Sequence, residues 1–76
     1  MTLTPAQSRA ARGLLDWSQT ELASRSNLSE STIRDFEKGR RVPSPNNLAA
    51  VERAFEVEGV EFLNDDAPGV RLRPRA

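Results

Sequence analysis

Hydrophobic residues recur every three or four positions through the first three-quarters of the chain, which predicts four amphipathic helices. Each predicted helix starts at a serine or threonine whose side chain can accept from the free N–H groups of the first turn. In the first and fourth helices a proline follows the cap and occupies the first helical position. The four predicted helices cover about residues 4–16, 18–26, 29–38 and 44–57.

Two of the caps are expected to be reciprocal capping boxes, in which the residue three positions later bonds back to the cap. These boxes are Thr4 with Gln7 and Ser18 with Glu21. Trp17 directly precedes the second box and is expected to pack into the core rather than to stack on bases. The predicted buried face of the first helix consists of Ala6, Ala10, Ala11, Leu14 and Leu15.

Residues that tolerate a positive φ angle mark the ends of the later helices. Asn27 predicts a sharp turn between the second and third helices, and Gly39 and Gly59 end the third and fourth. After Gly59 the pattern changes, because residues 60–63 and 70–73 alternate apolar and polar side chains around a turn-forming segment.

These patterns predict an all-α fold with a short C-terminal β-hairpin or strand. Residues 1–59 form the expected helical, DNA-binding domain. Residues 60–76 form the expected hairpin tail. A two-stranded hairpin is marginal alone in water, so it must pack on the helices or pair with another subunit.

The composition excludes several kinds of chemistry. The 76 residues include no cysteine, histidine or tyrosine, which removes disulfides, zinc sites of the usual kinds and a histidine base. No glycine-rich phosphate loop is present either, so we expect no enzyme, no metal and no cofactor. No apolar run approaches the roughly 20 residues that span a bilayer. No signal peptide is recognisable, so we expect a cytoplasmic protein without membrane association.

The net charge is zero, but the charges are unevenly distributed. Residues 1–50 carry seven basic and five acidic groups, residues 51–66 one basic and six acidic, and residues 67–76 three arginines and no acid. Ten of the eleven cations are arginine, the residue suited to bidentate contacts with phosphate and guanine. This pattern fits either a nucleic-acid binder or a solvated mixed surface, and charge alone does not decide between them.

The second and third predicted helices are short, and three or four residues join them, which is the layout of a helix-turn-helix. With Ile33 and Phe36 turned inward, the third helix presents an outward polar face that can reach base edges in a major groove. The alternative for this face is an ordinary solvated helix surface. The expected base-facing residues are Glu30, Ser31, Thr32, Arg34 and Asp35.

Phosphate contacts are expected on both sides of this helix. The second helix offers free N–H groups and the positive end of its dipole at its start, and a basic cluster follows the third helix. The expected phosphate-binding residues are Ser18, Gln19, Thr20, Lys38, Arg40 and Arg41.

The stretch from Arg9 to Phe55 resembles the Cro and lambda-repressor-like family, also called XRE-type helix-turn-helix regulators. The resemblance implies a bundle of four or five helices that binds operator DNA as a two-fold dimer. It also implies a phosphate contact by Gln19 and an internal salt bridge between Arg12 and Glu37. The match runs through Arg12, Ser18-Gln19-x-Glu21-Leu22-Ala23, Leu28-Ser29-x-Ser31-Thr32-Ile33, Phe36-Glu37-x-Gly39-x-Arg41, Pro43 and Leu48.

We therefore expect a sequence-specific regulator of transcription, repressor-like, that reads double-stranded DNA with residues 29–38. Useful affinity argues for a homodimer on half-sites about one helical turn apart. The hairpin is the expected dimer contact, because edge strands can pair across a two-fold axis. The residues expected at this contact are Phe62, Leu63, Val70 and Leu72.

The alternative function is a protein-interaction module on the same scaffold, such as an antitoxin or anti-activator, with weak or no DNA binding. The two acids on the outward face of the third helix favour this alternative, because phosphates repel them. With no ligand-sensing domain in the sequence, control of the regulator is expected from its own concentration or from a regulatory protein partner.

Overall fold

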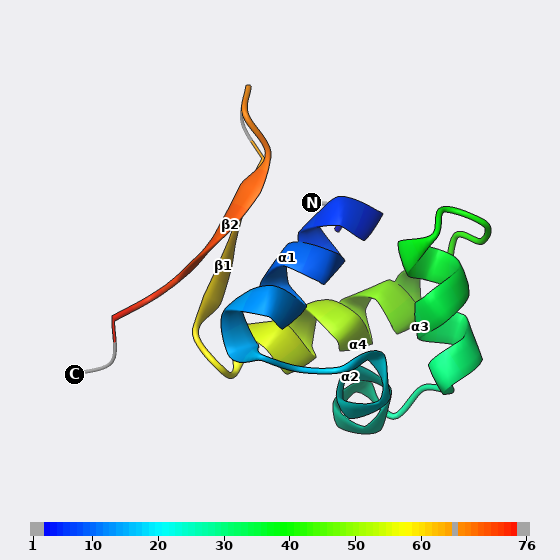
Figure 1. Ribbon diagram of the computed structural model, residues 1–76. Helices are drawn as coiled ribbons and strands as arrows, with labels where there is room; N and C mark the ends of the chain where they lie inside the picture. Colours follow the sequence, from blue (N-terminus) through cyan, green and yellow to red (C-terminus); the bar gives the residue numbers. More distant parts are fainter. Residues whose placement is uncertain (1–2, 65, 75–76) are drawn as a thin grey trace.

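Each of the four helices begins directly after the capping residue that the sequence predicts. The computed structural model describes residues 3–64 and 66–74. Figure 1 shows four helices followed by a two-stranded antiparallel hairpin, which confirms the predicted fold class. The elements are α1 Pro5–Leu15, α2 Gln19–Ser26, α3 Glu30–Glu37, α4 Pro45–Glu56, β1 Val60–Leu63 and β2 Gly69–Leu72.

One of the two predicted capping boxes is complete and the other is only half made. Gln7 N donates to Thr4 Oγ1 at 3.1 Å, and Thr4 N donates to Gln7 Oε1 at 3.0 Å. Ser18 accepts from Glu21 N at 3.0 Å, but the Glu21 carboxylate does not bond back to Ser18; it accepts from Arg25 Nε at 2.8 Å. The second box was therefore a wrong prediction, because a guanidinium four residues along is a stronger donor than a backbone amide.

Left-handed residues end the first three helices. Asp16, Asn27 and Gly39 have φ angles of 58°, 59° and 74°. At the end of α2, Leu28 N donates to Ala23 O at 2.9 Å, which is the hydrogen bond of a Schellman motif. The prediction that Asn27 turns the chain between α2 and α3 is confirmed, whereas the same geometry at Asp16 was not anticipated.

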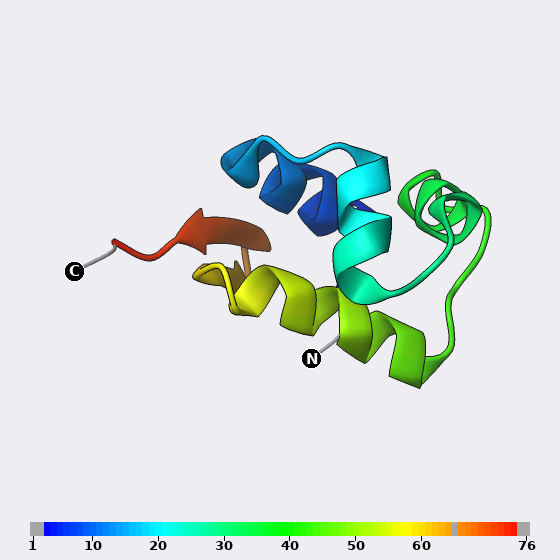
Figure 2. The ribbon, with the colours of Figure 1, turned by 90° about the horizontal axis from the view of Figure 1, so that it is seen from below.

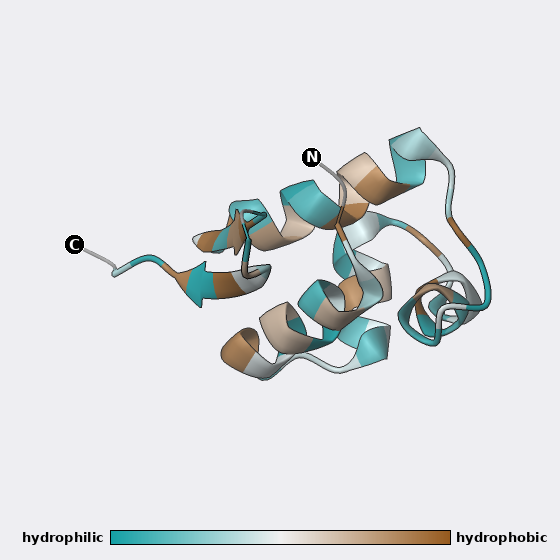
Figure 3. Ribbon diagram, turned by 90° about the horizontal axis from the view of Figure 1, so that it is seen from above, coloured by the Kyte–Doolittle hydropathy of each residue, from teal (hydrophilic) through white to brown (hydrophobic). Residues whose placement is uncertain are grey.

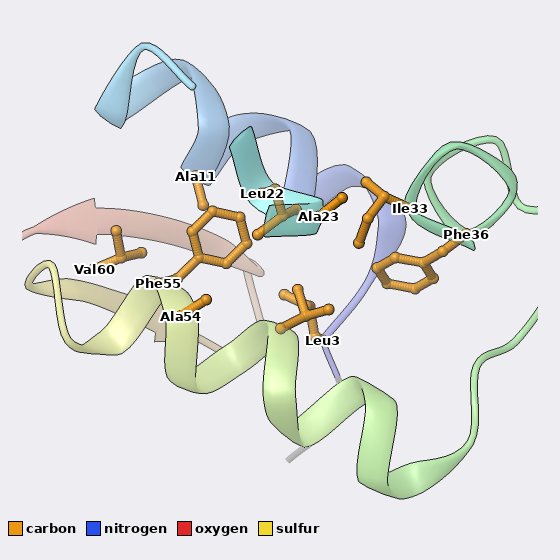
Figure 4. Packing of buried hydrophobic residues seen from close by; sticks show 10 residues of the cluster. Leu3, Ala11, Leu22, Ala23, Ile33, Phe36, Ala54, Phe55 and Val60 are labelled. Atoms are coloured by element: carbon orange, nitrogen blue, oxygen red, sulfur yellow. The ribbon is translucent and has the colours of Figure 1, made fainter. Parts of the chain in front are cut away.

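The hydrophobic core lies between α4 and the other helices, with Phe55 at its centre (Figure 4). The Phe55 ring is fully buried; it stacks on Trp17 at 5.6 Å between centroids and meets Phe62 edge-on at 6.0 Å. Trp17 thus packs against the core, as the sequence predicts. The guanidinium carbon of Arg25 lies over the Trp17 ring, 4.7 Å from the ring centroid. Leu3, which precedes the first helix, is also buried in this cluster and was missed.

The buried face of α1 differs from the predicted one. Ala6, Ala10 and Leu14 are exposed, and the buried residues of the helix are Gln7, Ser8 and Ala11. The prediction is confirmed for Ala11, which is buried, and for Leu15, which packs against the core. It was wrong for Ala6, Ala10 and Leu14, because it counted the small alanines as part of an apolar stripe. The inward face of α1 instead carries polar groups that bond to distant parts of the chain.

The hairpin shares the core with the helices. Val60 pairs with Leu72 and Phe62 pairs with Val70, so these four residues lie on one face of the sheet. Val60 is buried and Phe62 and Val70 are half-buried against the core. The alternation of hydrophobic and hydrophilic residues along the strands is visible in Figure 3.

The hairpin and α3 lie at opposite ends of the molecule, as Figures 1 and 2 show from perpendicular directions. The longest extent of the molecule is 33 Å. The longest helix, α4, has 12 residues, and within residues 3–64 and 66–74 no helix has the length and apolar character to cross a membrane.

Candidate nucleic-acid interface

The helices α2 and α3 form two eight-residue arms joined by a tight turn. Asn27 reverses the chain, and Ser29 then caps α3 by accepting from Thr32 N at 3.2 Å. The Ser29 hydroxyl also lies 2.7 Å from the Thr32 hydroxyl and 3.2 Å from the Ser31 hydroxyl. The start of α3 is thereby fixed by both backbone and side-chain contacts.

The inward face of α3 is fixed by packing and by charge. Ile33 and Phe36 belong to the buried core, and Glu37 is buried beside them at 2% exposure. These residues are three and four positions apart and occupy one side of the helix. The orientation of the opposite side is consequently determined.

The outward face of α3 carries the side chains that the sequence predicts for base contacts. Glu30, Ser31 and Arg34 are exposed, and Thr32 and Asp35 are half-buried. Among the residues that the structure describes, none forms a side-chain hydrogen bond or ion pair with Glu30, Arg34 or Asp35. These groups are available to an external partner, whereas the Ser31 and Thr32 hydroxyls are shared with Ser29.

A basic loop follows α3. Gly39 takes the left-handed conformation, and Arg40 N donates to Asp35 O at 2.9 Å, so the loop turns back over the last turn of the helix. Lys38, Arg40 and Arg41 are exposed, and no described residue pairs with their side chains. Three uncompensated cations therefore lie next to the C-terminal end of the outward face of α3.

Glu37 joins three helices through its carboxylate. Arg12 of α1 donates from Nη2 at 2.7 Å and from Nε at 2.9 Å, and Ser8 of the same helix donates at 2.6 Å. Gln19 of α2 donates from Nε2 at 3.1 Å. Arg9 also donates to the Glu37 backbone carbonyl. The pair of Arg12 and Glu37 that the resemblance implies is thus the centre of a larger network that includes Ser8 and Gln19.

The network keeps Glu37 charged in spite of its burial. Burial by itself raises the pKa of the carboxyl, but hydrogen bonds from Arg12, Ser8 and Gln19 and the charge of Arg12 outweigh burial. The net result is a Glu37 pKa below its ordinary value. Glu37 is the last residue of α3, so its ion pair with Arg12 holds the C-terminal end of α3 against α1 and α2.

The predicted phosphate-binding residues of α2 have different surroundings. Thr20 is exposed. The Ser18 hydroxyl accepts from Glu21 N, and the Gln19 amide donates to Glu37. The role of Gln19 in holding Glu37 was missed, because the two residues are 18 positions apart and nothing in their local sequence links them.

The residues predicted at a dimer contact lie on the hairpin. Leu63 and Leu72 are 37% and 40% exposed, whereas Phe62 and Val70 are half-buried against the core. On the other face of the sheet, Arg71 Nε lies 2.5 Å from Glu61 Oε1, and Arg73 Nε lies 3.7 Å from Glu61 Oε2. Two of the four residues are thus exposed apolar groups at the end of the molecule far from α3.

Two short helices joined by a tight turn define a helix-turn-helix domain, in which the second helix packs on the core with one face and exposes polar side chains on the other. A family model described as helix-turn-helix matches residues 9–62, which is more than half of the chain. The chain belongs to this family, in its XRE-type branch.

A curated relative supports the same assignment. The chain is 38% identical over 65 residues to an uncharacterized HTH-type transcriptional regulator, y4dL, from Sinorhizobium fredii (strain NBRC 101917 / NGR234). The match covers 86% of this chain and 33% of the relative. The chain therefore spans about a third of the length of the relative.

Proposed function

We propose that the chain is a sequence-specific regulator of transcription that binds double-stranded DNA and reads the major groove with α3. The observation that carries this proposal is the contrast between the two faces of that helix. Ile33, Phe36 and Glu37 fix the inward face, while Glu30, Arg34 and Asp35 on the outward side have no side-chain partner among the described residues. Polar groups on a rigid helix are what base recognition needs, because the groups must be positioned before the DNA arrives.

Each outward side chain has a base chemistry that suits it. Arg34 can donate two hydrogen bonds to a guanine, and Glu30 and Asp35 can accept from cytosine amino groups. Ser31 and Thr32 can contact a base edge or a thymine methyl group. The two acids weaken binding to DNA in general, because phosphates repel them, and so increase the share of the affinity that depends on sequence.

Phosphate contacts are assigned to the basic loop and to the start of α2. Lys38, Arg40 and Arg41 supply three cations with no partner within residues 3–64 and 66–74. At the start of α2, Ser18 and Thr20 flank Gln19. The Gln19 amide nitrogen has two hydrogens and uses one of them on Glu37, so the other can donate to a phosphate.

The proposal includes a homodimer joined through the hairpin and repression by occupancy of the bound site. The exposed Leu72 supports β2 as the contact, because an edge strand with an apolar side chain can pair with its symmetry mate. Leu63, also exposed, lies on β1 and on the other face of the sheet. Two chains place two α3 helices on a two-fold DNA site. A regulatory protein partner that competes for the hairpin is a means of control consistent with this arrangement.

The salt dependence of DNA binding tests this function against the protein-interaction alternative. With three free cations in each of two chains, about six phosphate contacts are expected, and affinity should fall about a thousandfold between about 50 and about 200 mM salt. Fluorescence anisotropy with a pool of short random-sequence duplexes measures this fall. An interaction module would bind weakly or not at all even at the lower salt concentration and would show no steep fall, and that result would contradict the proposed function.

A further inference from the structure

The Gln7 side chain joins α1 to the hairpin. It is 3% exposed, and its Nε2 atom lies 3.1 Å from Leu63 O, 3.2 Å from Asn64 Oδ1 and 3.1 Å from Gly69 O. These acceptors belong to the end of β1, the turn and the start of β2. One amide group therefore holds both strands at the closed end of the hairpin.

The orientation of this amide is fixed by the capping box. Gln7 Oε1 accepts from Thr4 N at 3.0 Å, which directs Nε2 toward the hairpin. Across residues 3–64 and 66–74, Gln7 makes every side-chain hydrogen bond between the hairpin and the helices. The remaining contacts of the hairpin with the helices are apolar, from Val60, Phe62 and Val70. Apolar packing has little directional preference, so the hydrogen bonds of Gln7 determine the angle of the hairpin.

The neighbouring residues of α1 hold the opposite end of the molecule. Ser8 donates to Glu37 at 2.6 Å and Arg12 pairs with the same carboxylate at 2.7 Å. Gln7 and Ser8 are adjacent in an 11-residue helix. A single rigid helix thus connects the hairpin at one end of the molecule to α3 at the other (Figure 1).

We propose that Gln7 is a positioning residue that fixes the hairpin relative to α3 and so sets the spacing of the two DNA half-sites. This inference rests on the proposed function, because it requires a second copy joined through the hairpin. In that dimer, the distance between the two α3 helices depends on the angle between each hairpin and its own α1. Removing the hydrogen bonds of Gln7 frees that angle without disturbing the contacts of α3 with DNA.

Hydrogen exchange of the Gln7→Met variant tests the first half of the inference. Methionine has a similar length and no donor, so the amides of residues 60–63 and 69–72 should exchange about tenfold faster. The amides of α2 and α3 should be unchanged, because Ser8 and Arg12 still hold Glu37. Leu14→Met, an exposed change on the same helix, is the matched control and should leave the hairpin amides unchanged. If Gln7→Met fails to fold, Gln7→Asn retains an amide that is too short to reach and should show the same effect.

Binding to duplexes with two half-sites at stepwise separations tests the second half. The half-site is taken from fragments that the wild-type chain selects from a random pool. The wild-type chain should bind duplexes of one half-site separation most tightly. The affinities of Gln7→Met for duplexes of neighbouring separations should lie within about twofold of one another, while its affinity for a single half-site stays the same.

The possible failures are distinguishable. Unchanged hairpin exchange, or a spacing preference that survives in Gln7→Met, overturns the role of Gln7 while DNA binding stands. A wild-type chain that binds no duplex overturns the proposed function and the spacing role with it.

Discussion

Replacing Glu37 with glutamine is expected to lower the free energy of unfolding by about 3 kcal/mol. The carboxylate accepts from Arg12, Ser8 and Gln19, and Glu37 is almost completely buried. An amide of the same shape places an NH₂ group against these donors and leaves the Arg12 cation without its counter-charge. A domain of this size is stabilised by about 4–11 kcal/mol, so the loss is a large part of the total. Urea denaturation followed by far-UV circular dichroism measures it.

Two controls separate the charge effect from a general disturbance of the fold. In a double-mutant cycle, Arg12→Met combined with Glu37→Gln should cost less than the sum of the single changes, because no unpaired charge remains. The pH dependence supplies the other control. Because folding lowers the pKa of Glu37, its contribution is present above the ordinary value of 4.5 and is lost as the pH falls through the folded value. The difference between the wild type and Glu37→Gln should therefore shrink below pH 4.5. A difference that stays constant in acid would contradict the account of the network.

Phe55→Ala is expected to have a similar or larger effect, about 3–5 kcal/mol of lost stability. The Phe55 ring fills the centre of the core and contacts both Trp17 of the segment between α1 and α2 and Phe62 of β1. Alanine leaves a cavity that helices cannot fill without moving, and it removes the aromatic contact between α4 and Phe62 of the hairpin. Denaturant unfolding of the purified variant gives the value, and near-UV circular dichroism reports the loosened aromatic packing.

The matched control for this substitution is Val57→Ala. Val57 follows α4 and is 72% exposed, so its removal should change stability by less than about 0.5 kcal/mol. A loss for Phe55→Ala that is no larger than the loss for Val57→Ala would show that the core is not organised around this ring.

The local features of the fold could be predicted because neighbouring residues determine them. Caps at Thr4, Ser18, Ser29 and Ser44 act on N–H groups within three residues, and the turn at Asn27 depends on the backbone of one residue. The outward face of α3 follows from the positions of Ile33 and Phe36 for the same reason. These predictions needed only helical periodicity and the residue types at the helix ends.

The polar contacts inside the molecule could not be predicted in this way. Gln7 and Ser8 are buried polar residues whose partners are distant in sequence: Leu63 lies 56 positions from Gln7, and Glu37 lies 29 positions from Ser8. Only the folded chain brings these groups together. The alanines at positions 6 and 10 are compatible with either a buried or an exposed face, so the pattern of α1 contained no signal that would correct the error.

The candidate nucleic-acid interface shows the same division between features set by nearby residues and contacts between residues distant in sequence. The residues of the outward face of α3 were expected from spacing, whereas the additional role of Gln19 depends on a carboxylate from another helix. Most contacts within one helix are thus predictable, with the pairing of Glu21 with Arg25 in place of Ser18 as an exception, and which distant group a residue bonds to requires the structure.

The central claim, that α3 reads bases, is tested most directly by comparing Arg34→Ala with Arg41→Ala on a duplex selected by the wild-type chain and on its single-base variants. Arg34→Ala is expected to remove about 1–3 kcal/mol of discrimination at one base pair, because its guanidinium can bind a guanine edge. Arg41→Ala is expected to weaken binding to every duplex by the same factor, because a phosphate contact carries no sequence information. A uniform loss from both variants, or a loss from neither, would contradict the assignment of α3 as the reading helix.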